Sequence, residues 1–581
     1  MKRTLLMLFI VAACATPVGG RASACVETPR PDSANPVLAQ QRAQFGFHDE
    51  ELVLCSPGFT EPVHLAARLW VPDACVGGDC PAVLIAHGFG FSKEATVADM
   101  YNAVGRGLVV LSYDVRGQGA SGGQSAFLQR DDVADQAAVL AWMYRELAPT
   151  KVAVYGVSQG GWLAMVAAIY NCGSSRAASF DLSVPCDEGG RWVDAVVPMQ
   201  GPTRFEGDGT CSTFLLQAIP MSRGNTRLTD AAAGCIADGS HPEGSIILDL
   251  TPGLDAIDVP VYFVTSFMDR LVLPQLVTEA YEHMRARGAS AEDPYAQDVR
   301  MLISNDGHGD VGGNFAVLDE VFAWIARALA GQSHPNEAPI AVAQEWGANR
   351  FRLEAAWPIP GTTDQVRLLS RSGSDATGAL VVDSPAGEAE PLFNVPNASS
   401  PPGVPFVGSM LRTQGSQGRP GMRLVYFTDP MPDTIEITGL PEASVWVSSS
   451  NAAGVGEGQI HVSLAEVTPA GDVTEFARGR RGVRGLGANP REVIVPLTVS
   501  GHRIDVGNRL MLAISPSDVG EAVPARTTDT MFVHHDASAP SGIRFSTVPV
   551  DRSLPPGDAP SGAAFTENPT GAICAALRLP C

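Results

Sequence analysis

The sequence predicts an α/β domain with a mainly parallel sheet covered by helices, followed by an all-β domain. Up to about residue 335, short and nearly continuous apolar runs alternate with stretches of helical periodicity. Continuous apolar strands between helices are typical of a parallel sheet that is buried on both faces. Beyond residue 335 the helical periodicity disappears, and apolar residues alternate with polar ones between turns rich in glycine and proline. That second pattern indicates antiparallel strands.

The N-terminus carries the pattern of an export signal. Lys2 and Arg3 precede an apolar run that is too short to span a bilayer, as in a secretory signal peptide. Cleavage after Ala24 would release a soluble chain, whereas the residues before Cys14 resemble a lipoprotein box that would leave Cys14 lipidated. We favour the soluble product, with residues 1–24 as the signal peptide. Membrane attachment is expected only with lipidation at Cys14.

Length and charge narrow the classes of function. The chain has 581 residues, which exceeds one ordinary core and suggests two large domains. Its formal net charge is −22, so no basic face is expected for a nucleic-acid partner. The sequence leaves the oligomeric state open.

The cysteines suit an exported chain. Eleven are present, and an even number remains once Cys14 is set aside, which favours a disulfide framework. None has the spacing of zinc ligands, so we expect no metal site. We expect nearest-neighbour pairing: Cys25 with Cys55, Cys75 with Cys80, Cys172 with Cys186, Cys211 with Cys235, and Cys574 with Cys581.

The α/β part contains a series of expected strands. A partly alternating run, His64–Val71, suits an antiparallel hairpin ahead of them. The clearest helices are Asp131–Leu147 and Leu273–Arg287. The apolar runs expected to form the main strands are Ala82–Ala86, Leu108–Tyr113, Val152–Tyr155, Val193–Met199, Val259–Thr265 and Val299–Ser304. Active sites of such sheets lie beyond the carboxyl ends of the strands.

A serine stands at the tip of a sharp turn between a strand and a helix. Val152–Tyr155 is followed by Gly156-Val157-Ser158-Gln159-Gly160, and an alanine-rich helical segment comes next. Such a turn needs small neighbours because it brings the strand and the helix close together, and Gly156 and Gly160 are those neighbours. We expect Ser158 to be a nucleophile and the backbone N–H of Gln159 to be one oxyanion donor.

The first main strand is followed by a glycine-flanked turn. Ala82–Ala86 runs into His87-Gly88-Phe89-Gly90. Glycines on either side let the backbone N–H of Phe89 face a pocket, so we expect it to be the second oxyanion donor. A plain tight turn is the alternative interpretation. We expect His87 itself to be structural.

A glycine-rich loop follows the next strand. Residues 114–122 contain a formal G-x-G-x-x-G pattern, which could suggest a dinucleotide. We reject this interpretation because no helix opens after the pattern and the strand before it is not the first of the sheet. We therefore expect no cofactor. The loop is expected to support the nucleophile, with Asp114 and Arg116 paired within it.

Two polar residues follow later strands of the predicted sheet. Asp269 comes just after Val259–Thr265, and His308 comes just after Val299–Ser304 in a glycine-flanked loop. The chain order serine, aspartate, histidine suits this architecture. We expect His308 to remove the proton of Ser158, Asp269 to orient His308, and the reaction to pass through an acyl-enzyme.

An insertion separates the strand that ends at Met199 from the strand that begins at Val259. Residues 200–258 leave the sheet on the side of the expected site, so we expect them to form a lid and a pocket wall; surface decoration is the alternative. A second insertion, Asn171–Gly190, is less clearly placed. Acidic residues that could hold a free amino group of a substrate are Glu206, Asp208, Asp230 and Asp238.

The second domain is expected to be a β-sandwich of the jelly-roll type. We place the boundaries at residues 25–335 for the α/β domain, with the lid insertion at about 200–258, and at residues 336–581 for the β domain. The alternating runs expected to form strands are Arg423–Thr428, Thr434–Ile437, Ser444–Ser448, Gln459–Val467, Val493–Val499 and Arg509–Ser515.

From about residue 50 to residue 550, the chain resembles the α/β-hydrolases that include Xaa-Pro dipeptidyl-peptidases, bacterial cocaine esterase and α-amino-acid ester hydrolases. The resemblance rests on Asp114-x-Arg116-Gly117, Gly156-x-Ser158-x-Gly160-Gly161, Asp269 and His308, and in the second half on Ile435–Gly439, Val445–Ser449, the hairpin from Val467 to Gly479, and Gly501-His502-Arg503. Two positions depart from the family, since Phe89 and Gln159 stand where its members often carry tyrosines.

The resemblance implies an exported serine hydrolase that acts on a small ester or a short peptide. The activity would be like that of a carboxylesterase or of an Xaa-Pro dipeptidyl-peptidase. The chain lacks the long N-terminal helical domain of the classical dipeptidyl-peptidases, which favours an ester substrate. The alternative is a catalytically inactive extracellular protein that binds a polymer through its jelly-roll domain.

Overall fold

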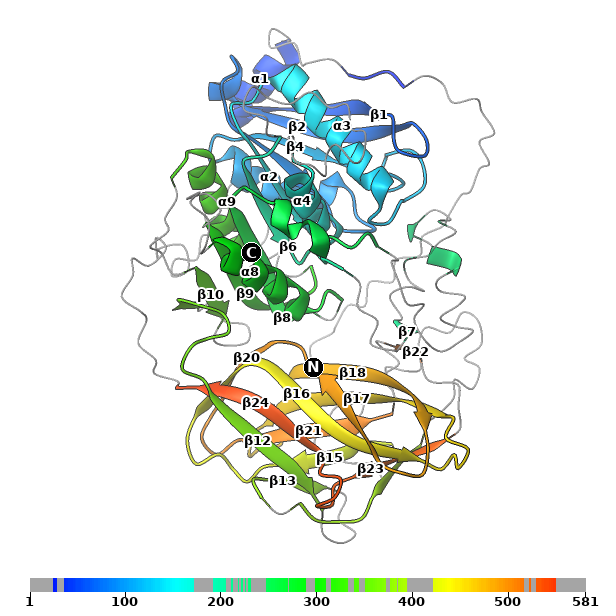
Figure 1. Ribbon diagram of the computed structural model, residues 1–581. Helices are drawn as coiled ribbons and strands as arrows, with labels where there is room; N and C mark the ends of the chain where they lie inside the picture. Colours follow the sequence, from blue (N-terminus) through cyan, green and yellow to red (C-terminus); the bar gives the residue numbers. More distant parts are fainter. Residues whose placement is uncertain are drawn as a thin grey trace, which may run out of the picture.

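The computed structural model shows two domains, one of sheet and helices and one of strands, which lie one above the other in Figure 1. It describes residues 25–28, 36–171, 192–204, 211–212, 218, 221–222, 225, 228–230, 247–269, 271–288, 298–309, 315–332, 339–343, 351–371, 377–383, 385–393, 422–516, 522–523 and 529–549. The signal sequence and Cys14 lie outside this part of the chain.

A ten-stranded sheet forms the centre of the first domain. Its strands are β1 (Phe47–Ser56), β2 (Val63–Pro72), β3 (Ala82–Ala86), β4 (Val109–Tyr113), β5 (Val152–Val157), β6 (Ala195–Met199), β8 (Val261–Met268), β9 (Val299–Gly307), β10 (Ile340–Ala343) and β11 (Phe351–Glu354). They are hydrogen-bonded in the order β1-β2-β4-β3-β5-β6-β8-β9-β10-β11.

The directions of the strands confirm the predicted class. Neighbours are parallel from β4 to β10, whereas β1 and β2 form an antiparallel hairpin and β11 runs antiparallel to β10. Each strand expected in this part is present. The sheet also continues past residue 335, because β10 pairs in parallel with β9 and β11 then pairs with β10.

Helices cover both faces of this sheet (Figure 1). They are α1 (Pro36–Phe45), α2 (Val97–Val104), α3 (Arg130–Leu147), α4 (Gln159–Ile169), α8 (Pro274–Gly288) and α9 (Phe315–Leu329). The side chains of β3 alternate between the two faces: Leu84 packs in the apolar cluster with α3, α4 and α8, whereas Val83 and Ile85 pack in the cluster with α2 and α9. A strand buried on both faces explains why the sequence is almost continuously apolar here.

The second domain is all-β, as predicted. Its strands are β12 (Thr363–Ser370), β13 (Gly378–Val381), β14 (Glu390–Phe393), β15 (Leu424–Phe427), β16 (Ile435–Ser449), β17 (Gly456–Val467), β18 (Val473–Leu486), β19 (Arg491–Pro496), β20 (Ser500–Ile504), β21 (Arg509–Ser515), β23 (Thr530–His534) and β24 (Gly542–Val548). All twelve belong to one hydrogen-bonded network around a separate apolar core. A jelly-roll connectivity stays a prediction.

Two strands that the sequence predicts separately are parts of one strand. Thr434–Ile437 and Ser444–Ser448 both lie along β16, whose pairing with β24 shifts between Thr438 and Glu442. Gly439 has φ +87° at that irregularity. A bulge of this kind bends a strand without ending it.

The two domains are in direct contact near the carboxyl end of β8. The ring of Phe267, on β8, lies so close to Gly501 on β20 that a Cβ atom at Gly501 would be 2.2 Å from it. Val499 and Val548 of the second domain pack in the same apolar cluster as Phe267. The second domain therefore supports the strand that leads to Asp269.

Two of the expected disulfides are present, Cys25–Cys55 and Cys75–Cys80. The other three expected pairs fall outside the part of the chain whose side chains are described. A minor two-stranded sheet joins β7 (Cys211–Ser212) to β22 (Ala522–Val523). Within the described ranges, no helix is long and apolar enough to cross a bilayer.

Candidate active site

Ser158 stands at a strained turn between β5 and α4. Its backbone has φ +58° and ψ −113°, a conformation that a residue with a side chain rarely adopts. A Cβ atom at Gly156, on β5, would lie 2.5 Å from the carbonyl carbon of Gly160 on α4, and one at Gly160 would lie 1.9 Å from the carbonyl oxygen of Ala86 on β3. The two glycines therefore permit the close approach that the sequence predicts, and the serine is only partly buried.

The structure brings the three expected catalytic residues together. The Oγ atom of Ser158 lies 2.9 Å from Nε2 of His308, and Nδ1 of His308 lies 3.0 and 2.9 Å from the two carboxylate oxygens of Asp269. They come from three different strands of the sheet, β5, β9 and β8, and His308 is 150 residues from Ser158 in the chain. This geometry allows Ser158 to donate to Nε2 while Nδ1–H donates to Asp269.

Asp269 is held firmly by its own loop. The side chain is fully buried, and its Oδ1 atom accepts hydrogen bonds from the backbone N–H groups of Leu271 (2.9 Å) and Val272 (2.8 Å). The second carboxylate oxygen is directed to His308. A buried carboxylate with several donors is fixed in orientation.

The His87 to Gly90 turn lies beside the serine. A Cβ atom on Gly88 would be 3.6 Å from the Cβ atom of Ser158. His87 is structural, as expected: Nε2 accepts from the backbone N–H of Val115 (2.9 Å), and Nδ1 lies 2.7 Å from the carbonyl of Gly88. Burial lowers the pKa of His87, which favours this neutral ring.

A pair of glutamines links the two segments that carry the expected oxyanion donors. The backbone N–H of Gly90, next to Phe89, donates to Oε1 of Gln118 (2.6 Å), and Nε2 of Gln118 donates to Oε1 of Gln159 (2.7 Å). Both side chains are buried. Gln159 is the first residue of α4, a position whose backbone N–H has no partner within its own helix. Sequence reasoning placed Gln118 in the glycine-rich loop but assigned it no role.

The expected pair between Asp114 and Arg116 is wrong. Arg116 forms a bidentate ion pair with Asp135 on α3, with N–O distances of 2.8 and 2.7 Å. A fork-shaped guanidinium favours a carboxylate that it can meet with two parallel bonds, and Asp135 offers that geometry across the loop. The sequence separation of 19 residues hid this partner.

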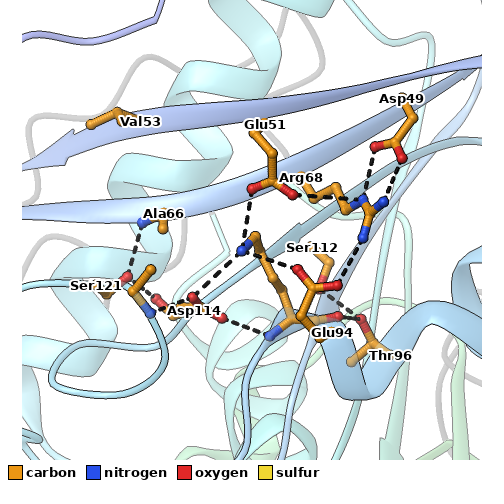
Figure 2. Close-up of polar contacts among 12 residues, drawn as sticks. Asp49, Glu51, Val53, Ala66, Arg68, Glu94, Thr96, Ser112, Asp114 and Ser121 are labelled. Carbon is orange, nitrogen blue, oxygen red and sulfur yellow. Dashed lines mark hydrogen bonds and ion pairs between the residues drawn. The ribbon is translucent and has the colours of Figure 1, made fainter.

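Asp114 instead ties the glycine-rich loop to the segment after the turn at residues 87–90. Its carboxylate accepts from the backbone N–H groups of Lys93 (2.6 Å) and Ala120 (2.7 Å). Figure 2 shows Asp114 among charged side chains from β1, β2 and the segment after β3, including Glu51 and Arg68. The Lys93 ammonium is 3.2 Å from Glu51 and 3.7 Å from Asp114. This network fastens the far end of the turn at residues 87–90.

Described residues of the 200–258 insertion lie against the site loops. A Cβ atom on Gly90 would be 2.6 Å from the sulfur of Met221, and Asn225 donates to the carbonyl of Ser125 (2.6 Å). Of the acidic candidates for holding an amino group, Asp230 is exposed. The other three, Glu206, Asp208 and Asp238, lie outside the described residues. In the described part of the chain, no group of three or more His, Cys, Asp or Glu side chains could hold a metal ion.

Two family models match the chain in succession. The model described as X-Pro dipeptidyl-peptidase (S15 family) matches residues 61–182, and the model described as X-Pro dipeptidyl-peptidase C-terminal non-catalytic domain matches residues 334–545. The first range includes Ser158 and the turn at residues 87–90. The second covers most of the all-β domain.

The chain is also similar to individual proteins over most of its length. Cocaine esterase from Rhodococcus sp. (strain MB1 Bresler) is 24% identical over 535 residues, covering 78% of this chain and 89% of that protein. The solved structure of an α-amino acid ester hydrolase has a TM-score of 0.66 at 14% identity and covers 92% of this chain and 100% of that one. An aminopeptidase from the marine sediment archaeon Thaumarchaeota archaeon has a TM-score of 0.61 at 14% identity, covering 91% and 99%. The two structural matches show a shared fold.

Proposed function

Because the chain belongs to the family of serine hydrolases that includes X-Pro dipeptidyl-peptidases and cocaine esterase, we propose that Ser158, His308 and Asp269 are its catalytic triad. The observation that carries the proposal is the position of His308. Its two ring nitrogens lie 2.9 Å from the Ser158 hydroxyl and 2.9 Å from the Asp269 carboxylate, within the reach that proton transfer requires.

The first half of the reaction forms an acyl-enzyme. Nε2 of His308 takes the hydroxyl proton as Oγ of Ser158 attacks the carbonyl carbon of the substrate, and Asp269 stabilises the imidazolium that results. The backbone N–H groups of Phe89 and Gln159 hold the oxyanion. His308 then returns the proton to the leaving alcohol or amine, and the bond to the leaving group breaks.

The second half releases the acid. Water enters where the leaving group was, and His308 removes its proton as the oxygen attacks the acyl carbon. The same two N–H groups stabilise the second oxyanion. Collapse of this intermediate returns the proton to Ser158 and frees the carboxylic acid, so the enzyme consumes only substrate and water.

The substrate class is an ester or amide of a small molecule or short peptide, and we favour an ester. The curated relative that aligns along most of the chain is an esterase by name. A dipeptidyl-peptidase must bind a free α-amino group, and Asp230, the described member of the acidic candidates, is exposed to solvent. The insertion at residues 200–258 would form one wall of the pocket, which its contact with Gly90 supports.

We propose that the enzyme is exported. The N-terminal sequence has the signal pattern, and the disulfides Cys25–Cys55 and Cys75–Cys80 are of a kind that persists in oxidising compartments. Fractionation of the source cells with an antibody to the chain would test this. Recovery of the full-length chain in the cytoplasm would contradict it.

The test of substrate class compares kcat/KM on a short-chain phenyl ester and on an Ala-Pro anilide, with Ser158→Ala as the control. Ester turnover that disappears in the variant would support a carboxylesterase. Efficient anilide cleavage that disappears in the variant would support a dipeptidyl-peptidase instead. Turnover that survives in Ser158→Ala would contradict the proposed nucleophile.

A further inference from the structure

Gln200 is the first residue after β6, the strand between β5 and β8. It has φ +48° and its side chain is completely buried. A non-glycine residue with positive φ and a buried amide is uncommon, and each is costly without compensating contacts.

The Gln200 amide brackets His308. Its Nε2 atom donates to the carbonyl oxygen of Gly307 (3.0 Å), the residue before the histidine. Its Oε1 atom accepts from the backbone N–H of Gly309 (2.7 Å), the residue after it. One planar side chain thus holds the backbone on both sides of His308, which fixes where the ring can project.

The same side chain reaches the strand that leads to Asp269. Nε2 also donates to Oγ of Ser266 on β8 (2.8 Å), and the backbone N–H of Asp269 donates to the carbonyl of Ser266 (3.2 Å). The amide group of Gln200 therefore connects the loop of the acid to the loop of the base. Its two N–H donors and one oxygen are all used.

The residue before Gln200 completes the connection. The carbonyl of Met199 accepts the backbone N–H of Ser158 (2.9 Å), and the backbone N–H of Gln200 donates to the carbonyl of Val264 on β8 (2.7 Å). Consecutive residues at the end of β6 are thus bonded to the segments that carry all three residues of the proposed triad.

We propose that Gln200 is a positioning residue that sets the place of His308 relative to Ser158 and Asp269. This inference rests on the proposed function. The loop of His308 needs such a restraint, because the histidine stands between two glycines and Gly309 has φ +80°, so the backbone alone specifies little. A neutral amide is also suited to this place, since it offers donors and an acceptor without adding a charge beside the ion pair of His308 and Asp269.

The test uses Gln200→Met, which keeps the length of the side chain and removes all three of its hydrogen bonds. We expect kcat for a phenyl ester to fall about 10- to 100-fold with little change in KM, because a displacement of about 1 Å at reacting groups costs up to about 100-fold. Gln136→Met is the matched control. Gln136, on α3, is about as buried as Gln200. Its replacement should leave kcat within about twofold of the value of the unchanged chain.

A double-mutant cycle separates positioning from general damage. In a His308→Ala background, Gln200→Met should change the residual activity less than threefold, because a residue that acts through His308 has nothing left to position. An equal loss in both backgrounds would overturn the inference. If Gln200→Met unfolds, Gln200→Asn keeps a neutral amide and suits the positive φ of this residue, but its side chain is one methylene too short to make all three hydrogen bonds; we expect it to fold and to lose at least about fivefold in kcat.

The failure of this inference differs from the failure of the proposed function. If Ser158→Ala keeps activity, the triad itself is wrong. If Ser158→Ala is inactive while folded Gln200→Met and Gln200→Asn both retain the kcat of the unchanged chain, the triad stands and Gln200 has no positioning role.

Discussion

Replacing Asp269 with asparagine should trap His308 in the wrong tautomer. Oδ1 of Asp269 accepts two backbone hydrogen bonds, from Leu271 and Val272, and lies 3.0 Å from Nδ1 of His308, while Oδ2 lies 2.9 Å from Nδ1. The two backbone donors engage both lone pairs of Oδ1, which leaves Oδ2 as the main acceptor for Nδ1–H. An asparagine has one oxygen. If the asparagine oxygen keeps the hydrogen bonds from Leu271 and Val272, the NH2 group of the side chain faces Nδ1 of His308. In the opposite orientation, the NH2 group would face both backbone N–H donors. The first orientation is therefore favoured.

The NH2 group of the asparagine changes which nitrogen of His308 carries the proton. With an NH2 group beside it, Nδ1 of His308 becomes an acceptor and the ring proton moves to Nε2. Nε2 then cannot take the proton of Ser158. The loss of kcat should be about 10³- to 10⁴-fold, the size that the same change produces in a serine protease triad, while both backbone bonds of the loop and the melting temperature are kept.

The assay measures kcat on a phenyl ester and the rate of labelling by a fluorophosphonate for Asp269→Asn. Thermal unfolding serves as the control for folding. A folded Asp269→Asn variant that retains more than about one tenth of the activity, beside an inactive Ser158→Ala, would refute this reasoning about the tautomer.

Three further changes test other parts of the account. Gln118→Met removes the hydrogen bond to the backbone N–H of Gly90 and should lower kcat about 10- to 100-fold without raising KM, because the oxyanion donors lose their alignment. An unchanged kcat would show that the turn at residues 87–90 keeps its conformation without Gln118. Gly501→Ala puts a Cβ atom 2.2 Å from the ring of Phe267, so overpacking should destabilise the chain by about 1–3 kcal/mol and lower kcat. If thermal unfolding and turnover keep their wild-type values, the second domain does not support the loop that carries Asp269. Burial raises the pKa of Asp99 to about 8, so the free energy of unfolding should fall as the pH rises from about 4 to about 8. Asp99→Asn removes this titration, and its stability relative to the unchanged chain should therefore rise by roughly 3–4 kcal/mol from pH 5 to pH 8. A stability difference that does not vary with pH would contradict the raised pKa of Asp99.

The parts of the fold that the sequence predicts are those with strong local patterns. β3 and β5 are continuous apolar runs because both of their faces are buried. β21 has the bounds that the sequence predicts, Arg509–Ser515, although its buried side chains form an uninterrupted run and not the expected alternation. The sequence does not predict β12, since only one of its eight residues is buried and its sequence lacks a periodic apolar pattern. β16 was divided in two because its bulge contains Gly439, which has the local signature of a turn.

Some residues of the site can be predicted from the sequence, and others cannot. Ser158, Asp269 and His308 were placed by a rule about the carboxyl ends of strands, and the structure brings them together. No motif predicts the roles of Gln118 and Gln200, because the role of an amide side chain depends on the hydrogen-bond partners that the folded chain brings to it. Gln200 nevertheless stands directly after a strand, so the rule that found the other residues could have found it too.

The measurement that tests the central claim most directly is covalent labelling of the purified protein by a fluorophosphonate, with the modified peptide identified by mass spectrometry. The proposed triad predicts one label, on Ser158, that is absent in Ser158→Ala and formed at least about 100-fold more slowly in His308→Ala. A label on another residue, or labelling of Ser158 that does not depend on His308, would contradict it.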